Sequence, residues 1–428
     1  MNILLTGSTG FIGRYILSKL AIEKHRITAC VRNPKTQQVH YPDVNFIAID
    51  FMHATSVDDW LPLLKDIDVV INAVGIISES ENQTFAALHA DAPSALFSAA
   101  EQAGVKRVVQ ISALGADEDA QSDYHLSKLA ADDVLASLSL DWFILRPSLV
   151  YGSGAKSMGL FRAMAALPVL PLIGGGMQTM QPVCIDDLVG AVLQCLQADT
   201  PAKKVIDVVG PEEMTMRQLL FKQRDWLGFA KTKAISMPLK WILKMMPLTR
   251  WLDEPALTAD SLKMLQRGNT ADVTAFERHL SKAPESMTSV LAKMPASPAD
   301  RWHARLYFMR PLLRLGIAFV WVWTAIVSVF LYPQEESYKL LESIGITGIL
   351  LPIALYGAAL MDLVLGVGMF LYKPLKHVLW LQMAVIIVYT IIITLLLPEY
   401  WLHPFGEISK NIPVFLSILV LYLMEEGK

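Results

Sequence analysis

Three segments of the chain place a tyrosine four residues before a lysine, which puts a phenol and an ammonium one turn apart on one face of a helix. They are Tyr124 and Lys128, Tyr15 and Lys19, and Tyr372 and Lys376. A phenol with its ordinary pKa of about 10 exchanges protons poorly at neutral pH unless a nearby cation favours the phenolate. Only the first pair follows a predicted strand that ends at Ser112. We therefore expect acid–base chemistry from Tyr124, assisted by Lys128 and Ser112.

A glycine-rich loop lies within the first thirteen residues. Between a predicted strand and a predicted helix, Thr6–Gly13 contains glycines in the spacing Gly-x-x-Gly-x-x-Gly. Glycines there allow a tight turn and close backbone approach, so that free amide groups and the helix dipole can meet a pyrophosphate. We expect a dinucleotide to bind the following residues of this loop: Gly7, Thr9, Gly10, Phe11, Ile12 and Gly13.

Two residues that end predicted strands are candidates for further contacts with the dinucleotide. Arg32 ends the second predicted strand, where NAD-selective folds usually offer a carboxylate to the ribose 2′-hydroxyl. A guanidinium would hold a 2′-phosphate, which favours NADP(H) over NAD(H); a solvated loop arginine is the alternative. Asp50 ends the third predicted strand and either accepts a hydrogen bond from the adenine amino group or caps the following turn.

A parallel sheet is needed to position these residues. Within residues 1–150, six short apolar runs are predicted strands: Asn2–Thr6, Arg26–Val31, Val44–Ile49, Val69–Asn72, Arg107–Ser112 and Trp142–Arg146. Three amphipathic segments between them, Gly10–Ala21, Thr84–Ala103 and Tyr124–Leu138, are long enough for right-handed crossover helices. The pattern predicts an α/β fold with a Rossmann-type, doubly wound parallel sheet. Residues 147–300, with proline-rich turns and the Gly174–Gly176 loop, are expected to form mainly a small substrate lobe.

Composition limits the possible functions. With 53% hydrophobic and 18% charged residues among 428, the chain is too apolar for one soluble domain, and only 14 of its 77 charges lie in residues 311–428. A net charge of −3 without a basic run makes nucleic acid an unexpected partner. The odd number of cysteines and the lack of Cys-x-x-Cys or His-Glu-x-x-His disfavour disulfides and a metal site.

Four apolar segments follow a basic linker at residues 301–311 and predict an all-α, four-helix transmembrane bundle. The spans are expected near residues 312–332, 347–372, 378–397 and 411–424. The first three can cross a hydrocarbon core of about 30 Å, whereas the fourth is short enough to be an interfacial or buried helix instead. Basic residues precede the first span and separate the second from the third. The positive-inside rule therefore predicts a multi-pass inner or plasma membrane protein whose N-terminal domain is cytoplasmic, and the first residues lack a secretory signal.

Asp362 is the one ionisable residue well inside a predicted span. An intramembrane carboxylate suggests a polar pathway or a site, and the alternative is a structural pair with a cation such as Arg314. We expect Trp321, Trp323 and Tyr356 to pack or to lie at the membrane interface rather than to form a cofactor cage.

Residues 1–300 resemble an atypical or extended short-chain dehydrogenase/reductase. The resemblance is carried by Thr6–Gly13, Asn72–Gly75, Ser112, Tyr124 with Lys128, and Arg146-Pro147. It is greatest to the group that contains the nucleotide-binding accessory subunit of respiratory complex I. The resemblance implies that Asn72, Ala73, Val74 and Lys128 contact the cofactor, and that Gln181–Leu188 closes a substrate cleft. It also implies a reductase, dehydrogenase or epimerase, although some relatives bind nucleotide without turnover.

The C-terminal region, residues 312–428, resembles the DoxX-like four-helix family. Arg310–Arg314, Tyr332-Pro333 and Asp362–Gly366 carry this similarity. Together the two resemblances predict a membrane-anchored NAD(P)H-dependent oxidoreductase for a lipophilic carbonyl or hydroxyl substrate, such as a quinone, isoprenoid or lipid intermediate. The alternatives are a nucleotide-sugar epimerase or dehydratase, and a non-catalytic NADPH-binding assembly or scaffold protein of a membrane complex. Membrane lipid is an expected partner, and no protein partner is identified by the sequence.

Overall fold

The computed structural model describes residues 1–80, 82–241, 243–244, 259–280 and 283–425. The chain divides into two compact units, Met1–Ala304 and Arg305–Lys428.

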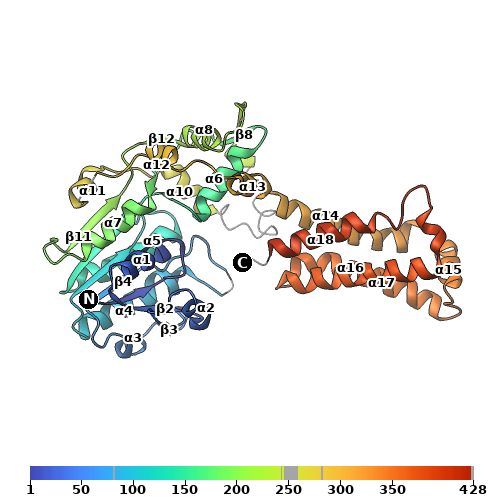
Figure 1. Cartoon of the computed structure of the whole chain (residues 1–428), viewed down its shortest axis with the longest axis horizontal. Coiled ribbons are helices and arrows are strands. Elements are labelled where there is room, and N and C mark those ends of the chain that lie inside the picture. The colour runs from blue at the N-terminus through green and yellow to red at the C-terminus, as the bar shows by residue number, and fades with distance from the viewer. Residues whose placement is uncertain (81, 242, 245–258, 281–282, 426–428) are drawn as a thin grey trace. The chain divides into compact units, whose positions relative to one another are not determined.

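The first unit is built on a seven-stranded parallel sheet (Figure 1). In chain order its strands are β1 (Asn2–Thr6), β2 (Arg26–Val31), β3 (Asn45–Ala48), β4 (Val69–Asn72), β5 (Arg107–Ile111), β6 (Asp141–Pro147) and β11 (Lys204–Val208). Their order in the sheet is β11-β6-β5-β4-β1-β2-β3, so the winding reverses between β1 and β4. This is the predicted Rossmann-like sheet, and its ligand crevice is expected at the carboxyl ends of those two strands.

Burial on both faces explains why most strands could be predicted from the sequence as continuous apolar runs. Every side chain of β4 and of β5 is buried, as is typical of parallel strands covered by helices on each side. β11 was not predicted as a strand. It lies within the residues expected to form the lobe, yet it pairs in parallel with β6 at the edge of the sheet.

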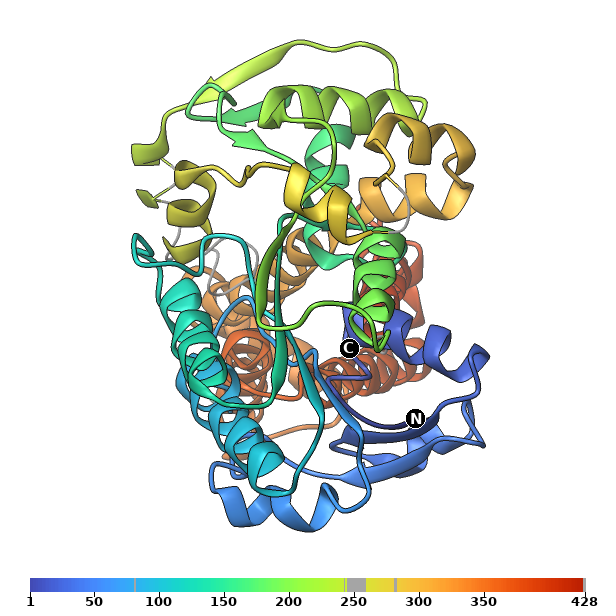
Figure 2. The ribbon, with the colours of Figure 1, turned by 90° about the vertical axis from the view of Figure 1, so that its left-hand side faces the viewer.

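Two groups of helices cover the sheet, and Figure 2 shows them on opposite faces. On one face α1 (Phe11–Ile22) packs against α7 (Ile185–Cys195). On the other, α4 (Ala92–Gln102) packs against α3 (Val57–Trp60) and α5 (Asp123–Ser137). A π-helical turn, η2 (Ala86–Asp91), leads directly into α4. Such turns are rare and often occur at functional sites.

In its described residues, the lobe contains three small sheets and a set of short helices. Its strands are β7 (Val150–Tyr151) with β10 (Val183–Cys184), β8 (Leu170–Ile173) with β13 (Ala234–Met237), and β9 (Thr179–Met180) with β12 (Met214–Thr215). Its helices are α6 (Lys156–Ala166), α8 (Met216–Trp226), α10 (Ala259–Arg267), α11 (Thr274–His279), α12 (Met287–Lys293) and α13 (Pro298–Leu306).

The second unit is helical. Among the described residues, three helical segments are long and apolar enough to cross a membrane: Met309–Leu331, Leu350–Leu371 and Leu375–Leu396. They correspond to α14 (Met309–Ile326) with the π-helical η3 (Val327–Leu331), α16 (Leu350–Leu371) and α17 (Leu375–Leu396). The fourth predicted span is α18 (Asn411–Met424), which has only 14 residues. An additional helix that we did not predict, α15 (Gln334–Ser343), connects the first two spans.

Candidate active site

The loop between β1 and α1 is packed too tightly for side chains at two of its glycines. A Cβ on Gly13 would lie 2.1 Å from the carbonyl oxygen of Gly7, and one on Gly7 would lie 2.5 Å from the backbone of Ala73. Gly10 differs because it is exposed, and a Cβ there would meet only the Gly7 oxygen, at 3.2 Å, among the described residues. In the described part of the chain, no side chain makes a capping hydrogen bond at the start of α1. The backbone N–H groups of the first turn therefore remain open to an anion.

A buried row of polar side chains ties the glycine loop to the neighbouring strand ends. Thr6 Oγ1 donates to Asn72 Oδ1 at 2.6 Å, and Asn72 Nδ2 donates to Gln110 Oε1 at 2.8 Å. The N–H of Val74 also donates to Asn72 Oδ1, at 3.3 Å. These hydrogen bonds hold Asn72–Val74 against the glycine loop, at the crevice where the sheet topology predicts a ligand.

Lys128 on α5 reaches the same edge of the sheet. Its Nζ donates to the carbonyl oxygen of Val74 at 3.0 Å and to that of Ile111 at 3.2 Å, so it bridges the ends of β4 and β5. Burial lowers the pKa of Lys128 to about 8. The structure thus brings Lys128 together with Val74, and the contact of these residues with a cofactor stays a prediction from the resemblance.

Tyr124 lies one turn before Lys128, in a cluster of aromatic rings. Its ring makes edge-on contacts with Phe85, His89 and His125, with centroids 5.3 to 5.9 Å apart. Burial raises the pKa of Tyr124 to about 12. Our expectation that Lys128 favours the Tyr124 phenolate is therefore wrong, because burial dominates and the ammonium bonds to two backbone carbonyls.

His89 supports this cluster in a single tautomer. Its Nε2 accepts a hydrogen bond from the N–H of Ile76 at 2.9 Å, so Nδ1 must carry the proton and donate to Ser127 Oγ at 3.0 Å. Ser127 in turn donates to the carbonyl oxygen of Tyr124 at 2.8 Å. Burial, with the charge of Lys128, lowers the pKa of His89 to about 2, so the ring is neutral. The π-helical turn η2 therefore supplies a rigid support for the start of α5.

Ser112 forms a hydrogen bond with Asp132, a residue that we did not predict to belong to the site. Its Oγ donates to Asp132 Oδ2 at 2.6 Å, and the same carboxylate oxygen lies 3.5 Å from Nε of Arg146. Burial raises the pKa of Asp132 to about 6, while Ser112 and Arg146 oppose that shift. In this geometry Ser112 donates its only proton to Asp132, and its predicted part in assisting Tyr124 stays a prediction.

The other predicted cofactor residues lie around the same edge. Arg32 is exposed directly after β2, and Thr9 is exposed in the glycine loop. Asp50 caps a turn, the alternative that we left open: its Oδ1 accepts from the N–H of Met52 at 3.0 Å. Phe11 and Ile12 open α1 and are half-buried.

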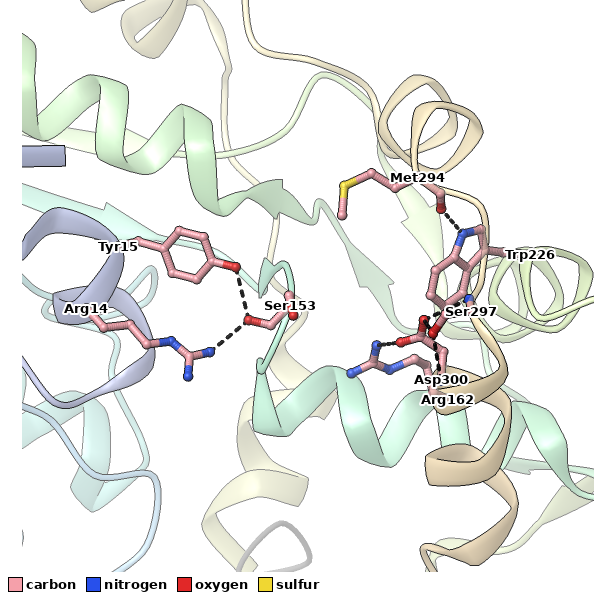
Figure 3. A network of polar contacts seen from close by, with 8 residues as sticks. All are labelled: Arg14, Tyr15, Ser153, Arg162, Trp226, Met294, Ser297 and Asp300. Atoms are coloured by element: carbon pink, nitrogen blue, oxygen red, sulfur yellow. Dashed lines mark hydrogen bonds and ion pairs between the residues drawn. The ribbon is translucent and has the colours of Figure 1, made fainter. Parts of the chain in front are cut away.

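Figure 3 shows how α1 also holds the loop that leads into the lobe. Arg14 Nη2 and the Tyr15 hydroxyl both donate to the carbonyl oxygen of Ser153, at 2.8 and 3.1 Å. At the far side of α6, Arg162 pairs with Asp300 at 3.3 Å. Tyr15 therefore has a structural contact of its own.

Sequence reasoning missed three side chains of the site, Phe85, His89 and Asp132. One signal was available: Tyr124, Lys128 and Asp132 are spaced by four residues and so share one face of α5. Nothing local marks Phe85 or His89, which reach Tyr124 only through the packing of η2 against α5.

Residues 7–160 match the model of a family described as NAD(P)H-binding, and residues 318–419 match the DoxX-like family. The chain joins an NAD(P)H-binding domain of the short-chain dehydrogenase/reductase kind to a C-terminal DoxX-like domain. The NAD(P)H-binding domain is related to the complex I subunit group: over 256 residues it is 27% identical to NADH dehydrogenase [ubiquinone] 1 alpha subcomplex subunit 9 of Arabidopsis thaliana. That alignment covers 56% of this chain and 64% of the relative.

A second relative is a ceramide reductase of Caulobacter vibrioides, 31% identical over 171 residues. It is matched over 40% of this chain and 53% of its own length. The chain thus spans less than two thirds of either relative. Among solved structures, UDP-glucuronic acid 4-epimerase from Bacillus cereus, in complex with UDP-glucuronic acid and NAD, aligns with a TM-score of 0.54 at 19% identity. This alignment covers 72% of this chain and all of the epimerase, and it supports the fold of the NAD(P)H-binding domain alone.

Proposed function

We propose that the protein is a membrane-anchored, NADP(H)-dependent oxidoreductase that reduces a lipophilic carbonyl compound or oxidises the corresponding alcohol. One observation carries this proposal: Lys128 bridges the ends of β4 and β5, and Tyr124 lies one turn earlier on the same face of α5. A proton-transferring phenol and a fixed cation then lie at the crevice beside the glycine loop.

The residues around the glycine loop fit a dinucleotide. Gly7 and Gly13 allow close packing, and the exposed side of Gly10 leaves room for a pyrophosphate at the start of α1. A bound nicotinamide would supply or accept the hydride. We assign Asn72–Val74 to the wall of this site and Arg32 to a 2′-phosphate, because an exposed guanidinium can pair with phosphate in a bidentate geometry.

Tyr124 suits the reducing direction. Because its pKa is raised to about 12, the phenol keeps its proton at neutral pH and can donate it to the oxygen that gains negative charge during carbonyl reduction. Lys128 supplies positive charge next to that transfer. Ser112 is a positioning residue in this scheme, since it fixes Asp132, which lies one turn after Lys128 on α5.

The membrane helices favour a lipophilic substrate. An enzyme held at a bilayer meets its substrate there, and the name of the ceramide reductase relative points to a lipid. We infer a lipid carbonyl or hydroxyl group as the reacting function.

We also propose four membrane crossings with the N-terminal domain in the cytoplasm. Arg310, next to the start of α14, donates to Glu425, next to the end of α18, at 2.5 Å. This pair supports a chain that begins its first crossing and ends its last at the same face of the membrane. The basic residues before α14 and between α16 and α17 favour the cytoplasm for that face.

A scaffold function is the second candidate. It is favoured by the relation to a complex I subunit and by the engagement of Ser112 with Asp132. Such a protein would bind NADPH without consuming it.

The deciding experiment follows NADPH absorbance with the full chain in lipid nanodiscs. One panel contains long-chain ketones and aldehydes, and a second contains UDP-sugars. We expect net NADPH oxidation with a member of the first panel. Conversion of a UDP-sugar without net oxidation would instead indicate an epimerase, and nucleotide binding without turnover on either panel would indicate the scaffold.

A further inference from the structure

A basic stretch of the lobe, residues 231–244, is exposed on the NAD(P)H-binding unit. Between residues 226 and 244 the sequence has four lysines and no acidic residue, although the whole chain has a net charge of −3. All four lysines are exposed: Lys231, Lys233, Lys240 and Lys244. In the part of the chain that the structure describes, none of them makes an ion pair. Their charge is therefore available to an anionic partner.

Large apolar side chains are exposed among these lysines. Ile235 on β13 is 57% exposed, and Trp241 and Leu243 after it are 67% and 46% exposed. The N–H of Trp241 donates to the carbonyl oxygen of Pro238 at 2.9 Å, so a turn follows β13 directly. We call Ile235, Trp241, Leu243 and the four lysines the lysine–tryptophan patch. Exposed apolar side chains gathered in this way mark an interaction surface.

The chain ties the start of this patch to the helix that leads into the membrane. Arg301 on α13 donates through Nε to the carbonyl oxygen of Leu227 at 2.9 Å, four residues before the patch begins. The neighbouring Asp300 pairs with Arg162 of α6 at 3.3 Å, as Figure 3 shows. Met309 begins the first apolar helical segment, eight residues after Arg301. Five of these residues run along α13, so the connecting chain is at most about 18 Å long.

We propose that the lysine–tryptophan patch docks on the surface of a bilayer that contains anionic phospholipids. Clustered lysines near a membrane span attract anionic headgroups. Tryptophan is favoured at the level of the headgroups, and the aliphatic side chains beside it can enter the acyl boundary. Single-stranded nucleic acid also binds lysines and aromatic rings, but the exposed Ile235 and Leu243 and the short connection to the membrane favour a lipid surface. This docking is independent of the proposed reductase reaction.

Fluorescence quenching by spin-labelled phospholipid tests the proposal with the full chain in nanodiscs. Ser236→Cys places a label at an exposed position within the patch, and the natural cysteines are all buried. We expect stronger quenching in phosphatidylcholine mixed with phosphatidylglycerol than in phosphatidylcholine alone. The difference should vanish in about 1 M salt, where the Debye length is about 3 Å. Equal quenching in the two lipid compositions would overturn the proposal. A response to single-stranded oligonucleotide but not to anionic lipid would assign the patch to nucleic acid instead.

Two pairs of lysines provide matched variants of the labelled chain. Lys240→Ala with Lys244→Ala removes two charges of the patch, whereas Lys35→Ala with Lys65→Ala removes two exposed charges elsewhere in the same unit. A lysine near an anionic membrane surface contributes about fivefold to docking, equal to about 1 kcal/mol. The first pair should therefore lower the ratio of docked to undocked protein about 30-fold, and the second should leave it unchanged. Equal effects of the two pairs would contradict docking through the patch.

Trp241 tests the apolar part of the patch. Trp241→Ser should lower quenching in both lipid compositions, because the side chain that enters the headgroup region is lost. Val39→Ser is the control, since Val39 is 81% exposed and lies outside the patch. It should leave quenching unchanged. Circular dichroism would verify that each variant is folded, and a folded Trp241→Ser chain with the quenching of the unsubstituted patch would contradict the proposal.

Discussion

At the scale of single residues, burial decides how the candidate acid–base pair can work. Tyr124 is half-buried against Phe85, His89 and His125, and Lys128 is anchored to backbone carbonyls. Each group is therefore held in its neutral form over a wider pH range than in water. The tyrosine is therefore suited to donate a proton rather than to accept one. The lysine is a cation near neutral pH and loses its proton at moderately alkaline pH.

Tyr124→Phe should preserve the fold and nucleotide binding but lower turnover of any accepted substrate by about 10² to 10⁴, the usual contribution of an acid–base group. The phenyl ring keeps the contacts to Phe85 and His89 while the proton donor is lost. Tyr372→Phe, at another Tyr-x-x-x-Lys pair, is the matched control and should keep the wild-type rate. Steady-state kinetics with calorimetry of NADPH binding would check both, and wild-type turnover by Tyr124→Phe would rule this tyrosine out.

The pKa of Lys128, lowered to about 8, predicts a pH dependence. The rate of carbonyl reduction should fall as the pH rises through about 8, because the ammonium is then lost. Unfolding does not explain that fall: Lys128 binds fewer protons in the folded than in the unfolded chain between its pKa of about 8 and the ordinary value of about 10.4, so this group adds stability as the pH rises.

A charge that does not titrate provides the control for this pH profile. Lys128→Arg should be slower overall, but its remaining rate should not decline near pH 8, since a guanidinium stays protonated there. If the variant and the wild type show the same decline, another group is responsible.

Arg32→Ala should weaken NADPH binding about tenfold or more and NADH binding little, because only NADPH carries a 2′-phosphate. A lost charged hydrogen bond costs about 1.5–3 kcal/mol. Calorimetric titration of both nucleotides measures the difference. An equal loss for the two would show that Arg32 does not select the cofactor.

At the scale of elements, the sequence predicts the bounds of most strands well, but it predicts poorly which elements pair or pack together. Strands buried on both faces are continuous apolar runs, so β1, β2 and β4 have the expected bounds. β11 is interrupted by Asp207 and begins at Lys204, so it is not a continuous apolar run, and only its pairing with β6 identifies it. Likewise, the glycine spacing predicts the nucleotide loop, whereas the contact of Ser112 with Asp132 depends on how α5 packs on the sheet.

Substitution of two glycines in the same loop should separate binding from folding. Gly10→Val should abolish NADPH binding in a folded protein, since its side chain would project into the space left for the pyrophosphate. Gly13→Val should unfold the domain, because its Cβ would lie 2.1 Å from the Gly7 oxygen. Circular dichroism and calorimetry distinguish the two results. A folded Gly10→Val protein with wild-type NADPH affinity would place the site elsewhere.

At the scale of the whole molecule, the uneven distribution of charge along the chain predicts the two units. The first 310 residues hold 63 of the 77 charges, and the division into compact units falls at Ala304. The number of crossings is harder to predict from the sequence, because α18 has 14 residues and would span only about 21 Å as an α-helix. The proposal that α18 crosses the membrane is supported instead by two long-range contacts. Asn411 bonds to Thr390 of α17, and Glu425 pairs with Arg310.

Four crossings predict that residue 1, the Lys373–Lys376 loop and Lys428, which lies outside the described residues, all face the cytoplasm. Reporter fusions at these three points would show on which side of the membrane each one lies, because green fluorescent protein is active inside and alkaline phosphatase is active outside. A fusion in the connection between α14 and α16, for example after Glu342, should give the opposite signal and serves as the control. If only the phosphatase is active at the C-terminus while the other points agree, α18 does not cross, and the chain has three spans.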